Sequence, residues 1–291
     1  MNPTADILRR HWPVESEKTL NLYLGTGRCG GCFDAYGLQH QDDLSPVTKR
    51  VSRTWLAHAE VWHRGRHGLD TQVPLARLRW SELPGEPTHY RQHLELAAGR
   101  LTTEFVGQNF RYTLTTFTNP AAARRDLLFF HLRWEGARRP DLVFVPVPVY
   151  PSEYSGDLIV QCTPSLNGRR ATLDLRRGSS QGVALALATG DLRVAIHGNG
   201  AVFHLDASAG AGIFVVALGP AARREELHAE LDHAAGETWE MLRAEAEEAW
   251  RARWGQTVFN IACPDQNALA WRSAYHLLCS YAPDVRCPAP P

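Results

Sequence analysis

The densest group of side chains that could bind a polar ligand lies between residues 62 and 70. Trp62, Arg64, His67 and Asp70 stand there among closely spaced glycines that permit tight turns. Their guanidinium, imidazole and carboxylate groups suit the hydroxyl groups of a sugar, and an indole ring suits stacking on its apolar face. We predict that these four residues bind a carbohydrate. The alternative is a surface hairpin in which the arginines pair with the aspartate.

A Cys-x-x-Cys sequence at Cys29 and Cys32 is typical of zinc or redox sites. A structural zinc ion needs four ligands, and no second such motif or close pair of histidines supplies the other two. On a strand, side chains three positions apart point to opposite faces unless the two intervening glycines bend the chain. We therefore expect these thiols to pack in the interior, and we expect no metal and no cofactor.

The composition and the missing motifs exclude several classes of function. The 291 residues include 31 lysines and arginines and 31 aspartates and glutamates, so no net field or basic stripe attracts nucleic acid. No P-loop, zinc-protease, hydrolase-elbow or dinucleotide-binding pattern occurs. The apolar stretches 142–150 and 212–218 are too short to cross a bilayer, so we expect neither a nucleic-acid nor a membrane partner.

The first 22 residues carry several charged side chains and no apolar region of the kind found in signal peptides. They predict a cytoplasmic protein if Met1 is the natural start.

A mainly β framework over residues 1–218 must position the candidate ligand-binding groups. From about residue 19 onwards, apolar residues recur at every second position, the spacing of strands, in runs such as 128–134 and 143–149. Turn sequences such as Asn167-Gly168 separate these runs at short intervals. Roughly a dozen or more such strands, most with one polar face, indicate two packed antiparallel sheets rather than one small barrel.

After Leu218 the apolar spacing changes to that of helices. Leucines and tryptophans recur every three or four residues, with glutamate and arginine between them. Gly236 is expected to divide this segment into two helices, and Gly255 is expected to end the second.

A third helix is predicted over about residues 266–281, with Asp265 as its N-cap. Its apolar residues must cover another element, because a lone amphipathic helix is not stable in water. Its apolar positions are Leu269, Tyr275 and Leu278, and we expect them either to dock on the sandwich or to belong to the first helix of a second domain absent from this chain.

Three stretches carry a resemblance to a known group of enzymes. The sequence LGTGRCGG at residues 24–31 is similar to the strand "LGNGRLGA" near the start of glycoside hydrolase families 65 and 95. Residues 90–134 resemble the hairpin series of the same N-terminal domain. The tryptophan-rich segment 239–254 and the Ile-x-x-Pro sequence at 261–264 resemble its linker to the catalytic barrel.

This resemblance implies a β-supersandwich, a helical linker and an (α/α) six-hairpin toroid in enzymes that hydrolyse or phosphorolyse glycosidic bonds. It divides the chain into a supersandwich domain (1–218), a helical linker (219–262) and the start of a truncated catalytic domain (263–291). The general acid and the water-activating carboxylate of such enzymes lie in the toroid. We therefore expect the catalytic pair to lie downstream of this chain, with no catalytic residue within it.

The resemblance thus predicts a non-catalytic domain that supports the barrel of a glycoside hydrolase or phosphorylase. Its substrate would be an oligosaccharide or glycoside, its partner the missing C-terminal catalytic domain, and the loop at 62–72 would reach the substrate. Two alternatives remain open. One is a free-standing carbohydrate-binding module, which would bind through an exposed aromatic platform.

The other alternative is a sugar epimerase similar to aldose mutarotase, which shares a supersandwich and uses histidine and glutamate as acid and base. Histidine titrates near neutrality and suits this chemistry. The candidates on predicted strands are His89, His93, His131, His197 and His204, with Glu95 or Glu104.

Overall fold

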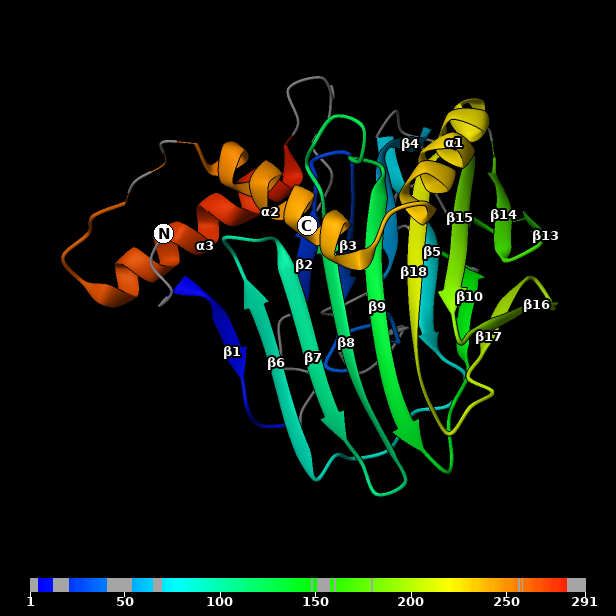
Figure 1. The fold of residues 1–291 in the computed structure, drawn as a ribbon. Coiled ribbons are helices and arrows are strands. Elements are labelled where there is room, and N and C mark those ends of the chain that lie inside the picture. The colour runs from blue at the N-terminus through cyan, green and yellow to red at the C-terminus, as the bar shows by residue number, and fades with distance from the viewer. Residues whose placement is uncertain are drawn as a thin grey trace.

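Eighteen strands precede three α-helices in the described part of this computed structural model (Figure 1). The structure describes residues 5–12, 21–40, 54–64, 70–147, 149–150, 158–159, 161–178, 180–255, 257 and 259–281.

Nine antiparallel strands form the larger sheet. Across the sheet they are β1 (Ile7–Arg9), β6 (His89–Glu95), β7 (Arg100–Val106), β8 (Phe110–Thr118), β9 (Leu127–Gly136), β18 (Ala209–Pro220), β15 (Ser180–Gly190), β14 (Arg170–Arg177) and β13 (Gln161–Asn167).

Seven antiparallel strands form the second sheet. In order they are β16 (Arg193–His197), β17 (Gly200–His204), β10 (Leu142–Pro146), β5 (Asp70–Trp80), β4 (Leu56–Arg64), β3 (Cys29–Phe33) and β2 (Leu22–Gly25). A separate ribbon pairs β11 (Val149–Tyr150) with β12 (Leu158–Ile159).

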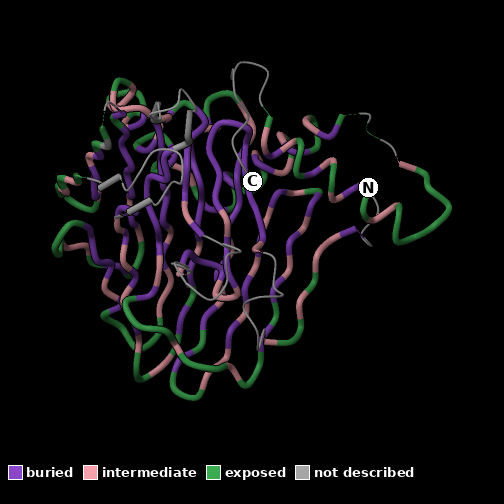
Figure 2. The backbone as a smooth tube through the Cα atoms, turned by 180° about the vertical axis from the view of Figure 1, so that it is seen from behind, coloured by how far each residue is buried: buried purple, intermediate pink, exposed green. Residues whose placement is uncertain are grey.

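The main core lies between the two sheets, where the chain is buried along most strands (Figure 2). In β7 and β8, buried side chains alternate with half-exposed ones, because successive side chains of a strand point to opposite faces. Leu101, Phe105 and Leu114 thus enter the core. The mainly β, two-sheet sandwich predicted from the alternating sequence is confirmed.

A second apolar cluster covers part of the opposite face of the nine-stranded sheet. Phe129, Val183 and Val215 pack there against residues of helices α1 (Arg224–Ala235) and α2 (Trp239–Trp254). Leu227 and Leu231 of α1 are one helical turn apart and are both fully buried. The central strands are therefore buried on both faces where helices cover them.

Both predicted helix boundaries in this segment are confirmed. Gly236 is the C-cap of α1, and Gly255 caps α2 with a φ of 52° that L-residues with side chains rarely adopt. Thr238 caps the start of α2, where its side-chain oxygen accepts a hydrogen bond from the Met241 amide.

The last helix, α3, extends over Pro264–Ser280. The expected N-cap at Asp265 is wrong, because the helix begins two residues earlier than expected, with Cys263 as N-cap and Pro264, whose fixed φ suits the first helical position, as its first residue. Of the apolar positions named from the sequence, Tyr275 is fully buried, whereas Leu269 is 64% exposed in this chain. Trp271, Tyr275 and Cys279 form the buried face.

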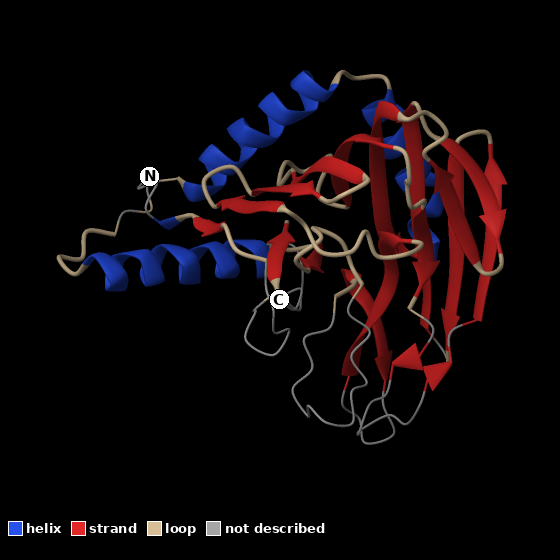
Figure 3. Cartoon of the chain, turned by 90° about the horizontal axis from the view of Figure 1, so that it is seen from below, coloured by secondary structure: helices blue, strands red, loops and turns tan. Residues whose placement is uncertain are grey.

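Tryptophans join the helices to the sandwich. The ring nitrogen of Trp250 donates to the carbonyl of Thr118, and that of Trp254 donates to the carbonyl of Leu96. Trp254 also contacts Trp271 of α3, with ring centroids 5.3 Å apart. Figure 3 shows the two sheets as facing layers, with α2 and α3 extending beyond one side of them.

Among the described helices, none combines the length and the apolar run that crossing a membrane requires.

Candidate functional site

The four residues predicted to bind a sugar belong to the β4–β5 hairpin. Arg64 and Asp70 lie opposite each other in the strand pairing, but their side chains, like the whole of His67, fall outside the described residues. Trp62 is half-buried, and its ring nitrogen donates to the carbonyl of Ala59 in the same strand. Sugar binding by the β4–β5 hairpin therefore remains a prediction.

Cys29 and Cys32 both lie on β3, and the two free thiols are not oxidised to a disulfide. Burial raises the pKa of Cys32 to about 12 and that of Cys29 well above its ordinary value. Both side chains are therefore thiols rather than nucleophilic thiolates at neutral pH. Within the described residues, no group of three or more histidine, cysteine, aspartate or glutamate side chains could hold a metal ion.

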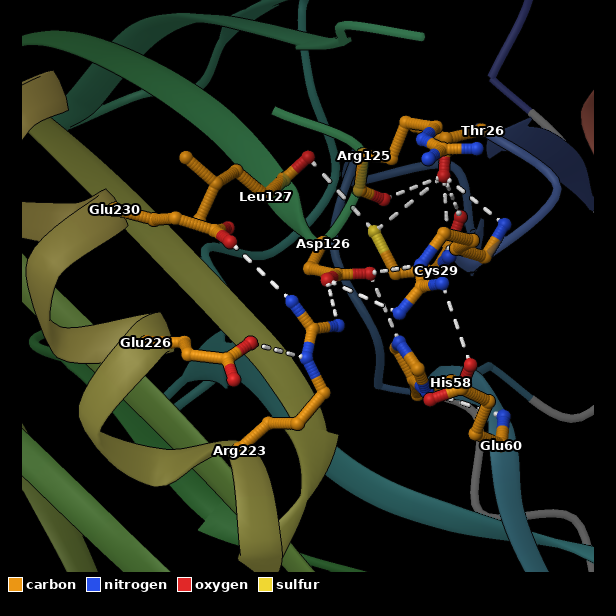
Figure 4. A network of polar contacts seen from close by, with 11 residues as sticks. Thr26, Cys29, His58, Glu60, Arg125, Asp126, Leu127, Arg223, Glu226 and Glu230 are labelled. Atoms are coloured by element: carbon orange, nitrogen blue, oxygen red, sulfur yellow. Dashed lines mark hydrogen bonds and ion pairs between the residues drawn. The ribbon is translucent and has the colours of Figure 1, made fainter. Parts of the chain in front are cut away.

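A buried carboxylate that sequence reasoning did not single out lies at the meeting point of both sheets and the linker (Figure 4). The Oδ1 atom of Asp126 accepts hydrogen bonds from Arg28 Nε and His58 Nε2, each at 2.9 Å. Its other oxygen, Oδ2, pairs with the guanidinium of Arg223. We call these four residues the Asp126 centre.

Each member of the Asp126 centre comes from a different part of the fold. Arg28 lies in the β2–β3 turn and His58 lies on β4, both in the seven-stranded sheet. Asp126 directly precedes β9 of the nine-stranded sheet, and Arg223 ends the short 3₁₀ turn that leads into α1. One carboxylate therefore connects both sheets and the first linker helix.

Further carboxylates surround the two guanidinium groups. Glu60 lies 3.3 Å from Arg28, while Glu226 and Glu230 of α1 lie 2.7 Å and 3.4 Å from Arg223. The Thr26 hydroxyl donates to the carbonyl of Arg125, the neighbour of Asp126, at 2.6 Å. The three carboxylates hold Arg28 and Arg223 on their sides away from Asp126, and the Thr26 hydroxyl holds the backbone next to Asp126.

The two most buried carboxylates of this region have opposite pKa shifts. Burial alone would raise the pKa of Asp126, but hydrogen bonds from His58 and Arg28, together with the charge of Arg28, outweigh it and lower the pKa well below its usual range. Burial raises the pKa of Glu230 to about 7, and the charge of Asp126 adds to this effect against the attraction of Arg223. Asp126 is therefore ionised at neutral pH, whereas Glu230 is partly protonated.

His58 has no ring nitrogen left for a substrate. Its Nε2 faces Asp126, and its Nδ1 accepts a hydrogen bond from the Glu60 amide at 3.1 Å. This arrangement assigns the proton of the neutral ring to Nε2. The His58 side chain is fully buried and that of Asp126 is 4% exposed, so neither group faces solvent.

The raised pKa of Glu230 predicts a pH-dependent stability. Because the folded-state pKa of about 7 exceeds the unfolded value of about 4.3, stability falls as pH rises between these values and is flat above them. Replacing Glu230 with glutamine removes this loss. Urea unfolding measures the free energy of unfolding of both proteins at each pH. Between pH 5 and pH 8, this free energy should rise in the variant relative to the wild type by at most about 3 kcal/mol.

The matched control for this experiment is Glu226→Gln. Glu226 also pairs with Arg223 and lies on the same helix, but its side chain is 65% exposed. Its stability profile should run parallel to that of the wild type. A Glu230→Gln profile that also runs parallel would contradict the assigned environment of Glu230.

A solvent-facing hollow of about 330 Å³ lies elsewhere, on the outer face of the nine-stranded sheet beside the start of α2. Its lining includes Thr102, Thr115, His131, Arg133 and Glu240. The volume falls at the lower end of the range for small-molecule sites. This hollow, rather than the Asp126 centre, is accessible to a ligand.

The histidines proposed for an epimerase are not gathered into one site. His197 and His204 lie on the seven-stranded sheet, whereas His89, His93 and His131 lie on the nine-stranded sheet. His93 pairs with Asp6 and His204 with Asp141. His131 and Glu95 line the same hollow, but they lie three strands apart, a separation of roughly 14 Å, and Glu95 is bonded to Arg100.

Comparisons with known proteins bear on the fold. No family profile and no curated protein matches the sequence. A solved structure from the human microbiome, assigned as a kojibiose phosphorylase, superposes with a TM-score of 0.68 at 8% sequence identity. The match covers 95% of this chain and 42% of that one, so this chain corresponds to less than half of the phosphorylase.

Two structures of a family GH92 alpha-mannosidase from Bacteroides thetaiotaomicron match less well. One gives a TM-score of 0.40 at 14% identity over 90% of this chain and 39% of that chain. The other, in complex with mannoimidazole, gives a TM-score of 0.39 at 15% identity over 89% of this chain and 37% of that chain. TM-scores below 0.5 do not establish a shared fold. The resemblance predicted from the sequence is confirmed by the first match at the level of the fold: this chain has the β-sandwich-and-helix architecture of a segment of a glycoside phosphorylase.

Proposed function

We infer that this chain is a non-catalytic supporting domain of a carbohydrate-active enzyme. The observation that carries this inference is the Asp126 centre, in which the buried ionisable groups are bonded to one another and hold the linker against both sheets. Buried charges paired in this way maintain a fixed arrangement of elements and leave no free acid or base for a substrate. The fold of the kojibiose phosphorylase supports the choice of carbohydrate chemistry.

Helix α3 supports the proposed division into a supersandwich (1–218), a linker (219–262) and the start of a catalytic domain (263–291). Its buried face contacts the sandwich, yet Leu269 and Leu277 on the opposite face are 64% and 70% exposed. A helix that is apolar on two faces is typically packed on both. We propose that the further chain of the catalytic domain covers the outer face.

Turnover assays test the non-catalytic role. The 291-residue chain is incubated with aryl glycosides, with kojibiose and phosphate, and with a freshly dissolved anomer of glucose followed by polarimetry. Each rate should equal that of buffer, because His58 and Asp126 are bonded to each other and closed to solvent. Glycoside cleavage by this chain would overturn the supporting role, and catalysed anomer exchange would favour the epimerase alternative.

A further inference from the structure

The outer face of strands β6 to β9 carries a regular grid of polar side chains below α2. Thr102 of β7, Thr115 of β8 and His131 of β9 are direct neighbours across the strands and form one row. Glu104, Thr113 and Arg133 form the next row in the same way. Side chains in such a row are held about 5 Å apart by the backbone pairing, so the surface is preorganised.

Most polar groups of this face have no hydrogen-bonding partner in the protein. Within the described residues, the hydroxyls of Thr102, Thr113 and Thr115 and the charged groups of Arg133 and Glu240 form no hydrogen bond or ion pair. They differ in this respect from the nearby Arg100, whose guanidinium is bonded to Glu95 and Glu247. A surface of aligned, uncommitted donors and acceptors is equipped to bind a polar ligand.

The charges around the hollow balance. The guanidinium groups and carboxylates in and beside it number three each: Arg100, Arg133 and Arg243 against Glu95, Glu240 and Glu247. Because no net positive charge remains, an anionic ligand has no electrostatic advantage over an uncharged one. Hydroxyl, guanidinium and carboxylate groups together offer both donors and acceptors, the set that adjacent hydroxyl groups of a sugar require.

His131 adds a neutral ring to this set. Its imidazole packs against Trp239 of α2, with ring centroids 4.9 Å apart. Burial lowers the pKa of His131, and the charge of Arg133 lowers it further. The ring is therefore uncharged at neutral pH and offers one donor and one acceptor.

A second hollow of about 280 Å³ continues along the same strands. It shares Thr113 and Arg133 with the first hollow and extends to Arg111 and Glu135. A ligand longer than one sugar unit can therefore contact both hollows, with Arg133 between them.

We propose that the outer face of β6 to β9, centred on Thr115, His131 and Arg133, is a binding site for a neutral oligosaccharide. The site would retain glycan on the supporting domain and is distinct from the predicted β4–β5 loop. The preference for a sugar over other uncharged polyols rests on the proposed function.

Isothermal titration calorimetry of the full 291-residue chain with glucose, maltose, maltotriose, cellotriose and inorganic phosphate tests this site. At least one neutral sugar should bind with a millimolar or tighter Kd. Arg133→Met should weaken that binding about tenfold or more, since hydrogen bonds to charged groups are the strongest of those available. Thr115→Val, which keeps the side-chain volume and removes the hydroxyl, should weaken it by a smaller factor of about five.

Two substitutions outside the hollows serve as matched controls. Arg193→Met removes an exposed arginine of β16, and Thr163→Val removes an exposed hydroxyl of β13, at the far edge of the sheet. Both should bind like the wild type, and circular dichroism should confirm that all four variants are folded.

The site is refuted if no neutral sugar binds, if phosphate alone binds, or if the control variants lose as much affinity as Arg133→Met. None of these results would contradict the proposed supporting role. Calorimetry measures binding, whereas the supporting role is tested by turnover and by the rigidity of the linker. Catalysis by the chain would refute the supporting role but leave a measured glycan site in place.

Discussion

Replacing Asp126 with asparagine is expected to lower the free energy of unfolding by about 3–5 kcal/mol. The carboxylate is buried and accepts bonds from Arg28, His58 and Arg223, so its loss leaves two guanidinium groups without their buried counter-charge. The asparagine side chain also places an N–H donor where these three side chains donate their hydrogen bonds. Urea unfolding at pH 7, followed by fluorescence of the nine tryptophans, measures this change.

The effect of Asp126→Asn should depend on pH with a defined sign. The pKa of Asp126 is lower in the folded than in the unfolded chain, so its stabilisation is present above the unfolded value of about 3.9 and is lost as pH falls below it. The gap between wild type and variant should therefore narrow below about pH 4.

The exposed pair of Asp206 and Arg193 provides the control for this substitution. Asp206→Asn removes the same kind of charge from an arginine, with a bond length of 2.9 Å, but at the surface. It should leave the urea midpoint unchanged, because exposed ion pairs contribute little. A change of less than about 1 kcal/mol for Asp126→Asn would show that the Asp126 centre does not hold the fold.

Replacing Trp250 with alanine is expected to lower the free energy of unfolding by about 3–5 kcal/mol. The indole is fully buried between α2, the sandwich and Tyr275 of α3, with the two ring centroids 5.6 Å apart. Its ring nitrogen donates to the Thr118 carbonyl at 2.8 Å, so the substitution leaves a cavity and an unpaired carbonyl. Urea unfolding followed by circular dichroism should show a lower midpoint than that of the wild type.

Two further variants define the Trp250 contact. Met241→Ala alters the same helix at a residue that is 58% exposed and should change stability by no more than about 0.5 kcal/mol. Gly99→Ala should destabilise the protein as well, because a Cβ there would lie 2.2 Å from the Trp250 ring and the backbone φ is 53°. If Trp250→Ala behaves like Met241→Ala, the linker is not held by this packing.

The alternation of apolar residues predicts the strands well because each strand buries one regular face between the sheets. In β9, Leu128, Phe130 and Leu132 all lie in the main core, as the period of two requires. The helices follow from their spacing and from the glycines at 236 and 255. The face of α3 is less predictable, since the exposed Leu269 is as apolar as the buried residues, and contacts with Trp254 and Phe259 cover Trp271 instead.

The Asp126 centre could not be predicted because its members lie far apart in sequence. Arg28 and Asp126 are separated by 98 residues, and no spacing rule brings a turn of one sheet to a loop of the other. A signal was present, since Arg28 belongs to the LGTGRCGG segment and Asp126 directly precedes an apolar strand. The polar grid was partly visible as alternating threonines in β8, but which of its groups lack a partner within the protein is shown only by the fold.

Amide hydrogen exchange of the wild-type chain tests most directly whether the helices and both sheets form one rigid support. Because the Asp126 centre and Trp250 join them, the buried amides of α1 and α2 should exchange as slowly as those of β9 and β18, in one cooperative opening. Exchange of both helices that is faster by orders of magnitude, while the strands stay protected, would contradict the account.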